Sequence, residues 1–271
     1  HSVFKGHMAI PRVGGHTPDM GYDVLIHFHG YAALAKTLVQ VSRGMVYVGV
    51  DLGLGSGAYS EAFQARGAYE QLMGSITSEL RKLTGDRRAH VRHVALSAWS
   101  AGYGAVVELL RQRASDVDAV ILLDGLHASW RPGGAKTGRV QDIEPIGIAP
   151  VLAYAERALR GEAIFVFTHS EILPPGYPST QITADWMIDY LGLSGAVQEH
   201  QQEGPYAITR TVDVQGLHIW SFAGNDKPAH CSHISHIAPV LHDLIEPLWD
   251  TPPMVRDLEP IPSDPGDRRL M

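Results

Sequence analysis

Six short apolar runs constrain the fold of this chain more than any other feature. Each has the length and the β-branched or aromatic content of a buried strand. The runs are Val24–Gly30, Met45–Val50, His93–Leu96, Val117–Leu123, Ala163–Thr168 and Leu217–Phe222. Because helical segments alternate with them, they predict an α/β protein with a mainly parallel sheet and helices on both faces. Right-handed crossovers would then place the carboxyl ends of these strands along one edge.

Helical spacing of apolar residues marks several of the intervening segments. We predict helices over Ala32–Val41, Ser60–Leu83, Ala101–Arg111 and Ala229–Leu248. Ser60 has the hydroxyl of a helix N-cap, and Gly85 is the kind of residue at which a helix stops.

We expect a single domain over residues 1–250. Residues 1–20 are rich in Gly, Pro and His, and they predict an irregular arm. Residues 131–160 and 172–210 combine Pro–Gly turns, polar stretches and a short helix, so we expect insertions or long loops over the active edge that form a small lid or a substrate wall. Residues 251–271 carry scattered charge after Pro252 and Pro253, which predicts a weakly packed C-terminal extension.

The composition is that of a soluble folded protein. Of the 271 residues, 45% are apolar and 19% charged, and the net charge of −7 favours neither nucleic acid nor an anionic membrane as a partner. No apolar run approaches the roughly 20 residues of a membrane-spanning helix. The single cysteine, Cys231, excludes an internal disulfide and a cysteine-based zinc site. The chain begins at His1 without a signal peptide, so a mature secreted or periplasmic form and a cytoplasmic protein both stay open, as does the oligomeric state.

One strand-to-helix junction carries a serine at its apex. The segment Ala98-Trp99-Ser100-Ala101-Gly102 lies between a predicted strand and a predicted helix, and small residues at both ends permit a sharp turn. A serine exposed in this way is the geometry of a nucleophile elbow, with Ala98 in place of the first glycine of G-x-S-x-G. The alternative is that Ser100 only caps the helix.

The order of polar clusters along the chain resembles that of the α/β-hydrolase superfamily over residues 22–248. The resemblance rests on His27-Phe-His-Gly-Tyr31, on the junction around Ser100, and on histidines beyond the last strand. It implies Ser100 as nucleophile and an oxyanion hole formed by the backbone N–H groups of Tyr31 and Ala101. The chain departs from the superfamily pattern because no glycine run follows Gly30.

The base and the acid each have more than one candidate. A catalytic histidine is expected in the first turn of the closing helix, which favours His230 over His233 and places His236 too deep. Asp124 ends a strand and is turned by the next glycine, which favours it as the acid over Glu171.

Four further side chains are expected at the same edge of the sheet. They would line the substrate cleft, and they are His29, Trp99, His127 and His169.

These residues together predict a serine hydrolase that cleaves carboxylic esters through an acyl-enzyme, without a cofactor or metal. The ester could be a small molecule or a polymer, and amides or thioesters stay open. A metal-dependent amidohydrolase is the first alternative, because His27 and His29 point to one side of a strand. A hydrolase-fold protein that binds a ligand without turnover is the second.

Overall fold

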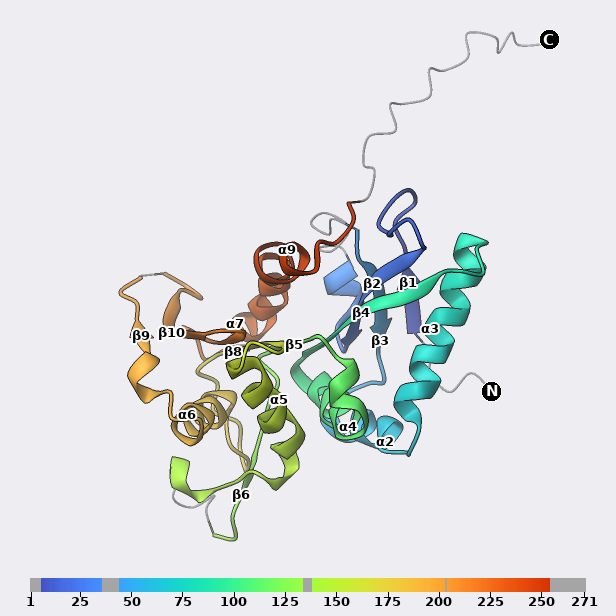
Figure 1. Cartoon of the computed structure of the whole chain (residues 1–271). Helices are drawn as coiled ribbons and strands as arrows, with labels where there is room; N and C mark the ends of the chain where they lie inside the picture. Colours follow the sequence, from blue (N-terminus) through green and yellow to red (C-terminus); the bar gives the residue numbers. More distant parts are fainter. Residues whose placement is uncertain (1–5, 36–43, 134–137, 203, 254–271) are drawn as a thin grey trace, which may run out of the picture.

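A computed structural model describes residues 6–35, 44–133, 138–202 and 204–253. Within these residues one sheet of nine strands runs through the molecule in the order β1-β3-β2-β4-β5-β8-β11-β10-β9 (Figure 1). The strands are β1 (Gly6–Ala9), β2 (Gly21–Phe28), β3 (Val46–Val50), β4 (His90–Trp99), β5 (Ala119–Leu123), β8 (Ile164–His169), β9 (Gln198–Glu199), β10 (Ile208–Val214) and β11 (Leu217–Phe222).

The six predicted strands form the parallel centre of this sheet. β3, β2, β4, β5, β8 and β11 pair side by side in parallel, so the predicted fold class is confirmed. Both edges are antiparallel, because β1 pairs with β3 and β10 pairs with β11. β1 lies in the predicted irregular arm, so that prediction is wrong for residues 6–9, and β10 begins at the end of the second predicted insertion. Three of the four residues of β1 are exposed, and β10, which lies between β11 and the two-residue edge strand β9, is only partly buried. Neither strand therefore has the continuous apolar run of a strand that is buried on both faces.

Helices cover both faces of the sheet, as the alternation of strands and helices predicts (Figure 1). One face packs against five helices, which are α2 (Ser56–Phe63), α3 (Ala68–Thr84), α4 (Tyr103–Arg113), α5 (Ala149–Leu159) and α6 (Thr180–Tyr190). The other face packs against Leu34 and the C-terminal helices, where Ile237, Leu241 and Ile245 are buried. Those helices are α7 (Lys227–Ser232), α8 (Ile237–Pro239) and α9 (Glu246–Trp249), joined by short 3₁₀ and π turns.

Three predicted helices differ in extent from the observed ones. The helix expected over Ala229–Leu248 begins at Lys227 and is interrupted by 3₁₀ and π turns. The helix expected over Ser60–Leu83 is split into α2 and α3 at Gly67, whose φ of 84° is left-handed, and Ser60 lies inside α2. Gly85 ends α3 in the left-handed conformation, as predicted. The helix expected over Ala32–Val41 is described only at residues 31–35, and its remainder lies outside the described residues.

The first predicted insertion contains a helix that belongs to the main fold. α5 buries Val151, Tyr154 and Ala155 against α4 and the sheet, so it is the crossover from β5 to β8 and not part of a lid. The stretch before it carries a short hairpin of β6 (Ser129–Trp130) and β7 (Ile143–Glu144). Most of the predicted C-terminal extension, from residue 254, lies outside the described residues.

The register of the parallel strands aligns their carboxyl ends. Phe28 of β2 pairs with Ala98 of β4, Trp99 of β4 pairs with Leu123 of β5, and Leu123 pairs with Thr168 of β8. The residues that follow these strand ends therefore meet at one edge, as expected for a parallel sheet.

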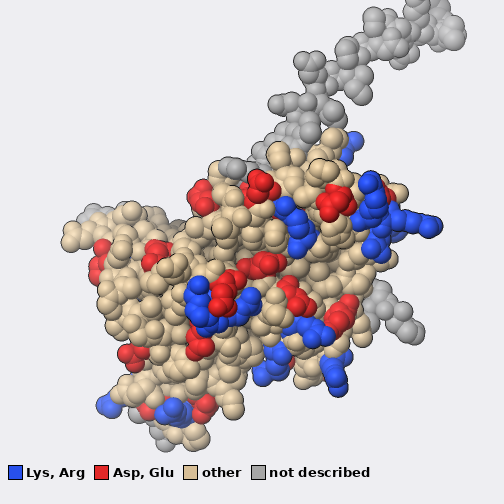
Figure 2. All heavy atoms as spheres, in the orientation of Figure 1, with Lys and Arg blue, Asp and Glu red and all other residues tan. Residues whose placement is uncertain are grey.

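Charged side chains of both signs are interspersed over the face of the molecule shown in Figure 2. Several form exposed ion pairs, such as Arg160–Glu162 and Arg88–Asp86, each at 2.7 Å. Solvent screens such exposed pairs, so they contribute little to stability. Among the described residues, no helix has the length and apolarity needed to traverse a bilayer.

Candidate active site

Ser100 occupies the apex of a sharp turn between β4 and α4. Trp99 is still extended, Ser100 has a left-handed φ of 51°, and a 3₁₀ turn then leads into α4. A non-glycine residue in this conformation costs on the order of 1 kcal/mol, so the surrounding structure has to hold it there. Gly102 and Gly125 enclose the turn closely: a Cβ on Gly102 would lie 2.1 Å from the carbonyl oxygen of Phe28, and one on Gly125 would lie 2.2 Å from that of Ser100.

Asp124 follows β5 and is 3% exposed. Its Oδ2 accepts hydrogen bonds from His230 Nδ1 and Ser170 Oγ, each at 2.7 Å. Its Oδ1 accepts from the Ser170 backbone N–H at 3.0 Å and from Thr180 Oγ1 at 2.7 Å. Burial acts to raise the pKa of the carboxyl, but the hydrogen bond from His230, the nearby His233 and the other donors outweigh it and lower that pKa. Asp124 is therefore an ionised carboxylate at neutral pH.

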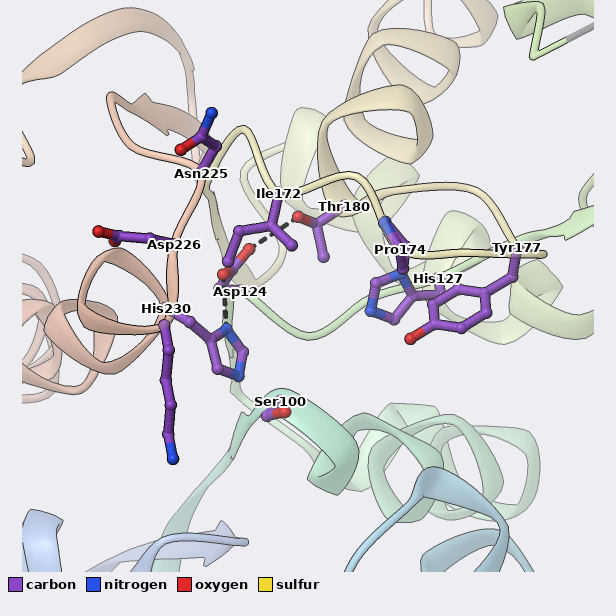
Figure 3. A pocket seen from close by; sticks show the side chains of 11 residues that line it. Ser100, Asp124, His127, Ile172, Pro174, Tyr177, Thr180, Asn225, Asp226 and His230 are labelled. Carbon is purple, nitrogen blue, oxygen red and sulfur yellow. Dashed lines mark hydrogen bonds and ion pairs between the residues drawn. The ribbon is translucent and has the colours of Figure 1, made fainter.

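His230 lies in the first turn of α7, where the side chain of Asp226 caps the helix by accepting from the Ala229 N–H at 2.9 Å. Because its Nδ1 donates to Asp124, the lone pair of the neutral ring is on Nε2. Figure 3 shows this ring between Asp124 and Ser100. The indole N–H of Trp99 donates to the His230 carbonyl at 3.0 Å, which ties the histidine to the elbow. Among the described residues the hydroxyl of Ser100 has no hydrogen bond to this ring.

The alternative base and acid lie in other environments. His233 is 1% exposed, its Nδ1 is 2.7 Å from Thr168 Oγ1, and its ring packs against Phe222. Burial lowers the pKa of His233 to about 3. Glu171 is exposed and accepts from the Gly224 N–H at 3.0 Å, so it ties two loops together. The structure thus brings Asp124 and His230 to Ser100, and it places His233 and Glu171 elsewhere.

The backbone donor expected at Tyr31 already has a partner. The Asp51 carboxylate, which follows β3, accepts from the Gly30 N–H at 2.8 Å and from the Tyr31 N–H at 3.2 Å. The Ala101 N–H lies at the start of the 3₁₀ turn after Ser100, where the first N–H groups have no partner within the helix. The two expected oxyanion donors therefore differ, because only that of Tyr31 is held by a carboxylate.

A pocket of about 330 Å³ opens beside Ser100, Asp124 and His230 (Figure 3). Its other lining residues are His127, Ile172, Pro174, Tyr177, Thr180, Asn225, Asp226 and Lys227. The loop of residues 172–179 thus forms one wall of the pocket.

Of the four residues expected in the cleft, only His127 lines this pocket. The ring of His29 lies against that of Trp99 at 5.2 Å, and its Nδ1 is 2.9 Å from the Tyr59 hydroxyl. His169 is 1% exposed, with its Nε2 2.7 Å from Ser221 Oγ. The rings of His29, Trp99 and His169 thus contact neighbouring side chains at the strand ends and do not line the pocket.

The histidine pair of the metal-site alternative is separated by its surroundings. His27 is fully buried with its Nδ1 2.9 Å from Ser97 Oγ, and burial lowers its pKa to about 3. His29 instead contacts Tyr59. In the part of the chain that the structure describes, no group of three or more His, Cys, Asp or Glu side chains is arranged to hold a metal ion.

Comparison with solved structures addresses the fold. The enterochelin esterase of Shigella flexneri superposes with a TM-score of 0.51 at 12% identity, covering 90% of this chain and 55% of that one. The chain has the α/β-hydrolase fold. This α/β-hydrolase-fold chain spans only about half the length of that esterase.

Two other solved structures superpose at lower scores. A monoacylglycerol lipase of Paleococcus ferrophilus gives a TM-score of 0.43 at 13% identity, covering 88% of this chain and 99% of that one. The carboxylesterase CesB of Bacillus subtilis gives 0.45 at 11% identity, covering 91% and 92%. No protein-family model and no curated protein sequence matches the chain.

Sequence reasoning missed three polar residues around the candidate site of this α/β-hydrolase fold. Ser170 and Thr180 hold the carboxylate of Asp124, and Asp51 holds the loop of Gly30 and Tyr31. Asp51 could have been found, since it directly follows a predicted strand and so had to lie at the active edge. Thr180 comes 56 residues after Asp124, and no local pattern links the two.

Proposed function

We propose that this protein is a serine hydrolase that cleaves carboxylic esters through an acyl-enzyme. Ser100 is the nucleophile, His230 the general base and acid, and Asp124 the carboxylate that orients His230. The observation that carries the proposal is the 2.7 Å hydrogen bond from His230 to Asp124, beside a serine with a φ of 51° in the same pocket. The ester is preferred among acyl substrates because the superposed Shigella protein is named for ester cleavage.

The proposed mechanism follows from the proton positions. Nε2 of His230 takes the proton of the Ser100 hydroxyl as its oxygen attacks the ester carbonyl. Asp124 stays ionised, because its donors keep its pKa low, and it stabilises the imidazolium that forms. His230 then gives its proton to the leaving alkoxide. Water, activated by the same imidazole, hydrolyses the acyl-enzyme and restores the Ser100 hydroxyl.

The oxyanion of the tetrahedral intermediate needs preorganised donors. In this proposal the Ala101 N–H is one donor, and the Tyr31 N–H joins it once the Asp51 carboxylate releases it. Removal of one such donor costs roughly 3–4 kcal/mol of transition-state stabilisation in studied hydrolases.

Labelling with a fluorophosphonate probe, which reacts with activated serines, tests the proposal. We expect the wild type to be labelled and to hydrolyse p-nitrophenyl esters, with both activities lost in Ser100→Ala. Ser115→Ala is the matched control, because this serine is exposed after α4 and should leave both activities unchanged. Equal labelling of wild type and Ser100→Ala would refute the nucleophile. Loss of wild-type ester hydrolysis on treatment with a chelator would instead favour the metal-dependent alternative.

The same experiment distinguishes the proposed hydrolase from a protein that binds a ligand without turnover. In that case Ser100 would be inert toward the probe and no p-nitrophenyl ester would be hydrolysed. Esters of increasing acyl length then define the pocket, since activity confined to short chains would indicate that the wall of residues 172–179 limits the acyl group.

A further inference from the structure

His127 stands in the wall of the pocket, three residues after Asp124. Figure 3 shows His127 and Tyr177 on the side of the pocket opposite Asn225 and Asp226. The Nδ1 of His127 is 2.8 Å from the carbonyl oxygen of Pro178. The ring meets Tyr177 edge to face at 4.8 Å and Tyr103 at 5.7 Å. One hydrogen bond and two aromatic contacts thus fix the orientation of this imidazole.

These contacts also fix which nitrogen carries the proton. A carbonyl oxygen can only accept, so Nδ1 of His127 is the donor to Pro178. Burial is the largest influence on the pKa of His127 and lowers it, so the ring is neutral at pH 7. Nε2 is consequently an unprotonated acceptor, and it has no hydrogen-bond partner among the described residues. It is not sealed in the protein interior either, because the ring lines the pocket.

The buried carboxylate of the pocket is already engaged. Both oxygens of Asp124 accept hydrogen bonds from His230, Ser170 or Thr180. Asp226 caps α7. A substrate that fills the pocket without a donor would leave His127 Nε2 desolvated and unpaired, which is more costly than a lost hydrogen bond alone.

We propose that His127 is a specificity-determining residue, whose Nε2 accepts a hydrogen bond from a hydroxyl group of the substrate. The substrate class is then a hydroxyl-bearing carboxylic ester rather than a plain alkyl ester. This inference rests on the proposed ester hydrolysis at Ser100, and it adds the polar group that the substrate carries beside the scissile bond.

Matched ester pairs test this selectivity. On the acyl side we would compare p-nitrophenyl 3-hydroxybutyrate with its 3-methoxy counterpart, and p-nitrophenyl 4-hydroxybenzoate with 4-methoxybenzoate. On the alcohol side we would compare 2-hydroxyethyl with 2-methoxyethyl butyrate. For at least one pair we expect wild-type kcat/KM to favour the hydroxyl compound by about tenfold. His127→Phe keeps an aromatic ring against Tyr177 and removes the acceptor, so the preference should fall to near unity.

Two further variants separate recognition from packing. Tyr177→Phe keeps the ring contact with His127 and should retain the preference. His127→Gln keeps an acceptor and should retain part of it, which tests the proposal even if His127→Phe does not fold. The proposal is overturned if the wild type does not discriminate within any pair, or if His127→Phe lowers kcat/KM equally for both members of each pair. Ester hydrolysis that still depends on Ser100 would then leave the proposed function standing, whereas a wild type inactive on every ester would overturn both.

Discussion

Replacement of Asp124 by asparagine is the sharpest test of the proposed triad, because its four hydrogen bonds dictate how the amide must sit. If the amide nitrogen takes the place of Oδ1, it meets the Ser170 backbone N–H, a donor that cannot turn away. If it takes the place of Oδ2, the Ser170 hydroxyl can rotate to accept. His230 can then accept at Nδ1 by moving its proton to Nε2. The second arrangement satisfies every group, so Asp124→Asn should fold and hold His230 in the wrong tautomer for catalysis.

The size of the loss follows from two costs. To recover the productive tautomer, the amide must face the Ser170 N–H, which leaves buried donors unpaired at about 1–3 kcal/mol. The imidazolium also loses its charged hydrogen-bond partner, at about 1.5–3 kcal/mol. Together these give roughly 3–6 kcal/mol, or a 10²- to 10⁴-fold lower kcat. A change of this size also agrees with the loss of about 10⁴ known for the same substitution in a serine protease triad.

Steady-state hydrolysis of p-nitrophenyl acetate at pH 7.5, with the midpoint of thermal unfolding as a check of folding, measures the effect. Thr180→Val removes one donor to Asp124 without touching His230, so it should lower kcat by less than about tenfold. Glu171→Gln, the rival acid, should leave kcat nearly unchanged. A folded Asp124→Asn that keeps more than a tenth of wild-type kcat, or a larger loss in Glu171→Gln, would refute the assignment of the acid.

Three further predictions concern His230, Asp51 and His233. His230→Gln should lower kcat at least 10³-fold and His233→Gln less than tenfold, in the same ester assay, because only His230 contacts Asp124; the reverse order would exchange their roles. Asp51→Asn keeps an acceptor for the Gly30 N–H but removes a charge that competes with the oxyanion for Tyr31, so kcat should rise several-fold; a folded variant with unchanged kcat would exclude Tyr31 from the oxyanion hole. Burial lowers the pKa of His233 to about 3 in the folded protein, whereas in the unfolded chain it keeps the ordinary value of 6.5. Between these two values the unfolded chain binds one more proton at His233, so the free energy of unfolding falls as the pH is lowered from 6.5 to about 3. His233→Gln should therefore reduce the slope of the unfolding free energy against pH by roughly 1.4 kcal/mol per pH unit, measured by urea titrations between pH 6 and 4. An unchanged slope would contradict the buried, neutral state of His233.

The central sheet could be predicted because its strands are buried on both faces. The run Ala119–Leu123 is buried along its whole length, so its continuous apolar character is visible in the sequence. The outer strands β1 and β10 could not be found in this way, because β1 is mostly exposed and β10 is only partly buried. The break at Gly67 was missed for a different reason: a glycine within a helical pattern shows a left-handed turn only once the packing of α2 and α3 is known.

In the candidate site, too, some residues can be placed from the local sequence pattern, whereas others depend on contacts that are distant in the sequence. Ser100 and Asp124 each follow a strand directly, so the topology of a parallel sheet brings them together once the strands are known. His230 and His233 differ by less than one helical turn, and the choice between them depends on where α7 begins. The cap by Asp226 sets that start and leaves His230 beside Asp124, which is 106 residues away in the sequence. A sequence pattern can place a residue at the edge of a sheet, but only tertiary contacts select its partner.

The turn around Ser100 explains why Ala98 can stand where the pattern has its first glycine. Ala98 is the penultimate residue of β4, fully buried and paired with Phe28 and Leu122, so it is an extended residue with room for a methyl group. The tight approach comes after the serine, where a side chain on Gly102 would collide with the carbonyl of Phe28. A small residue is thus sufficient before the turn, whereas glycine is required after it. The departure at Ala98 leaves the left-handed conformation of Ser100 intact, because β2 and the loop after β5 enclose that conformation.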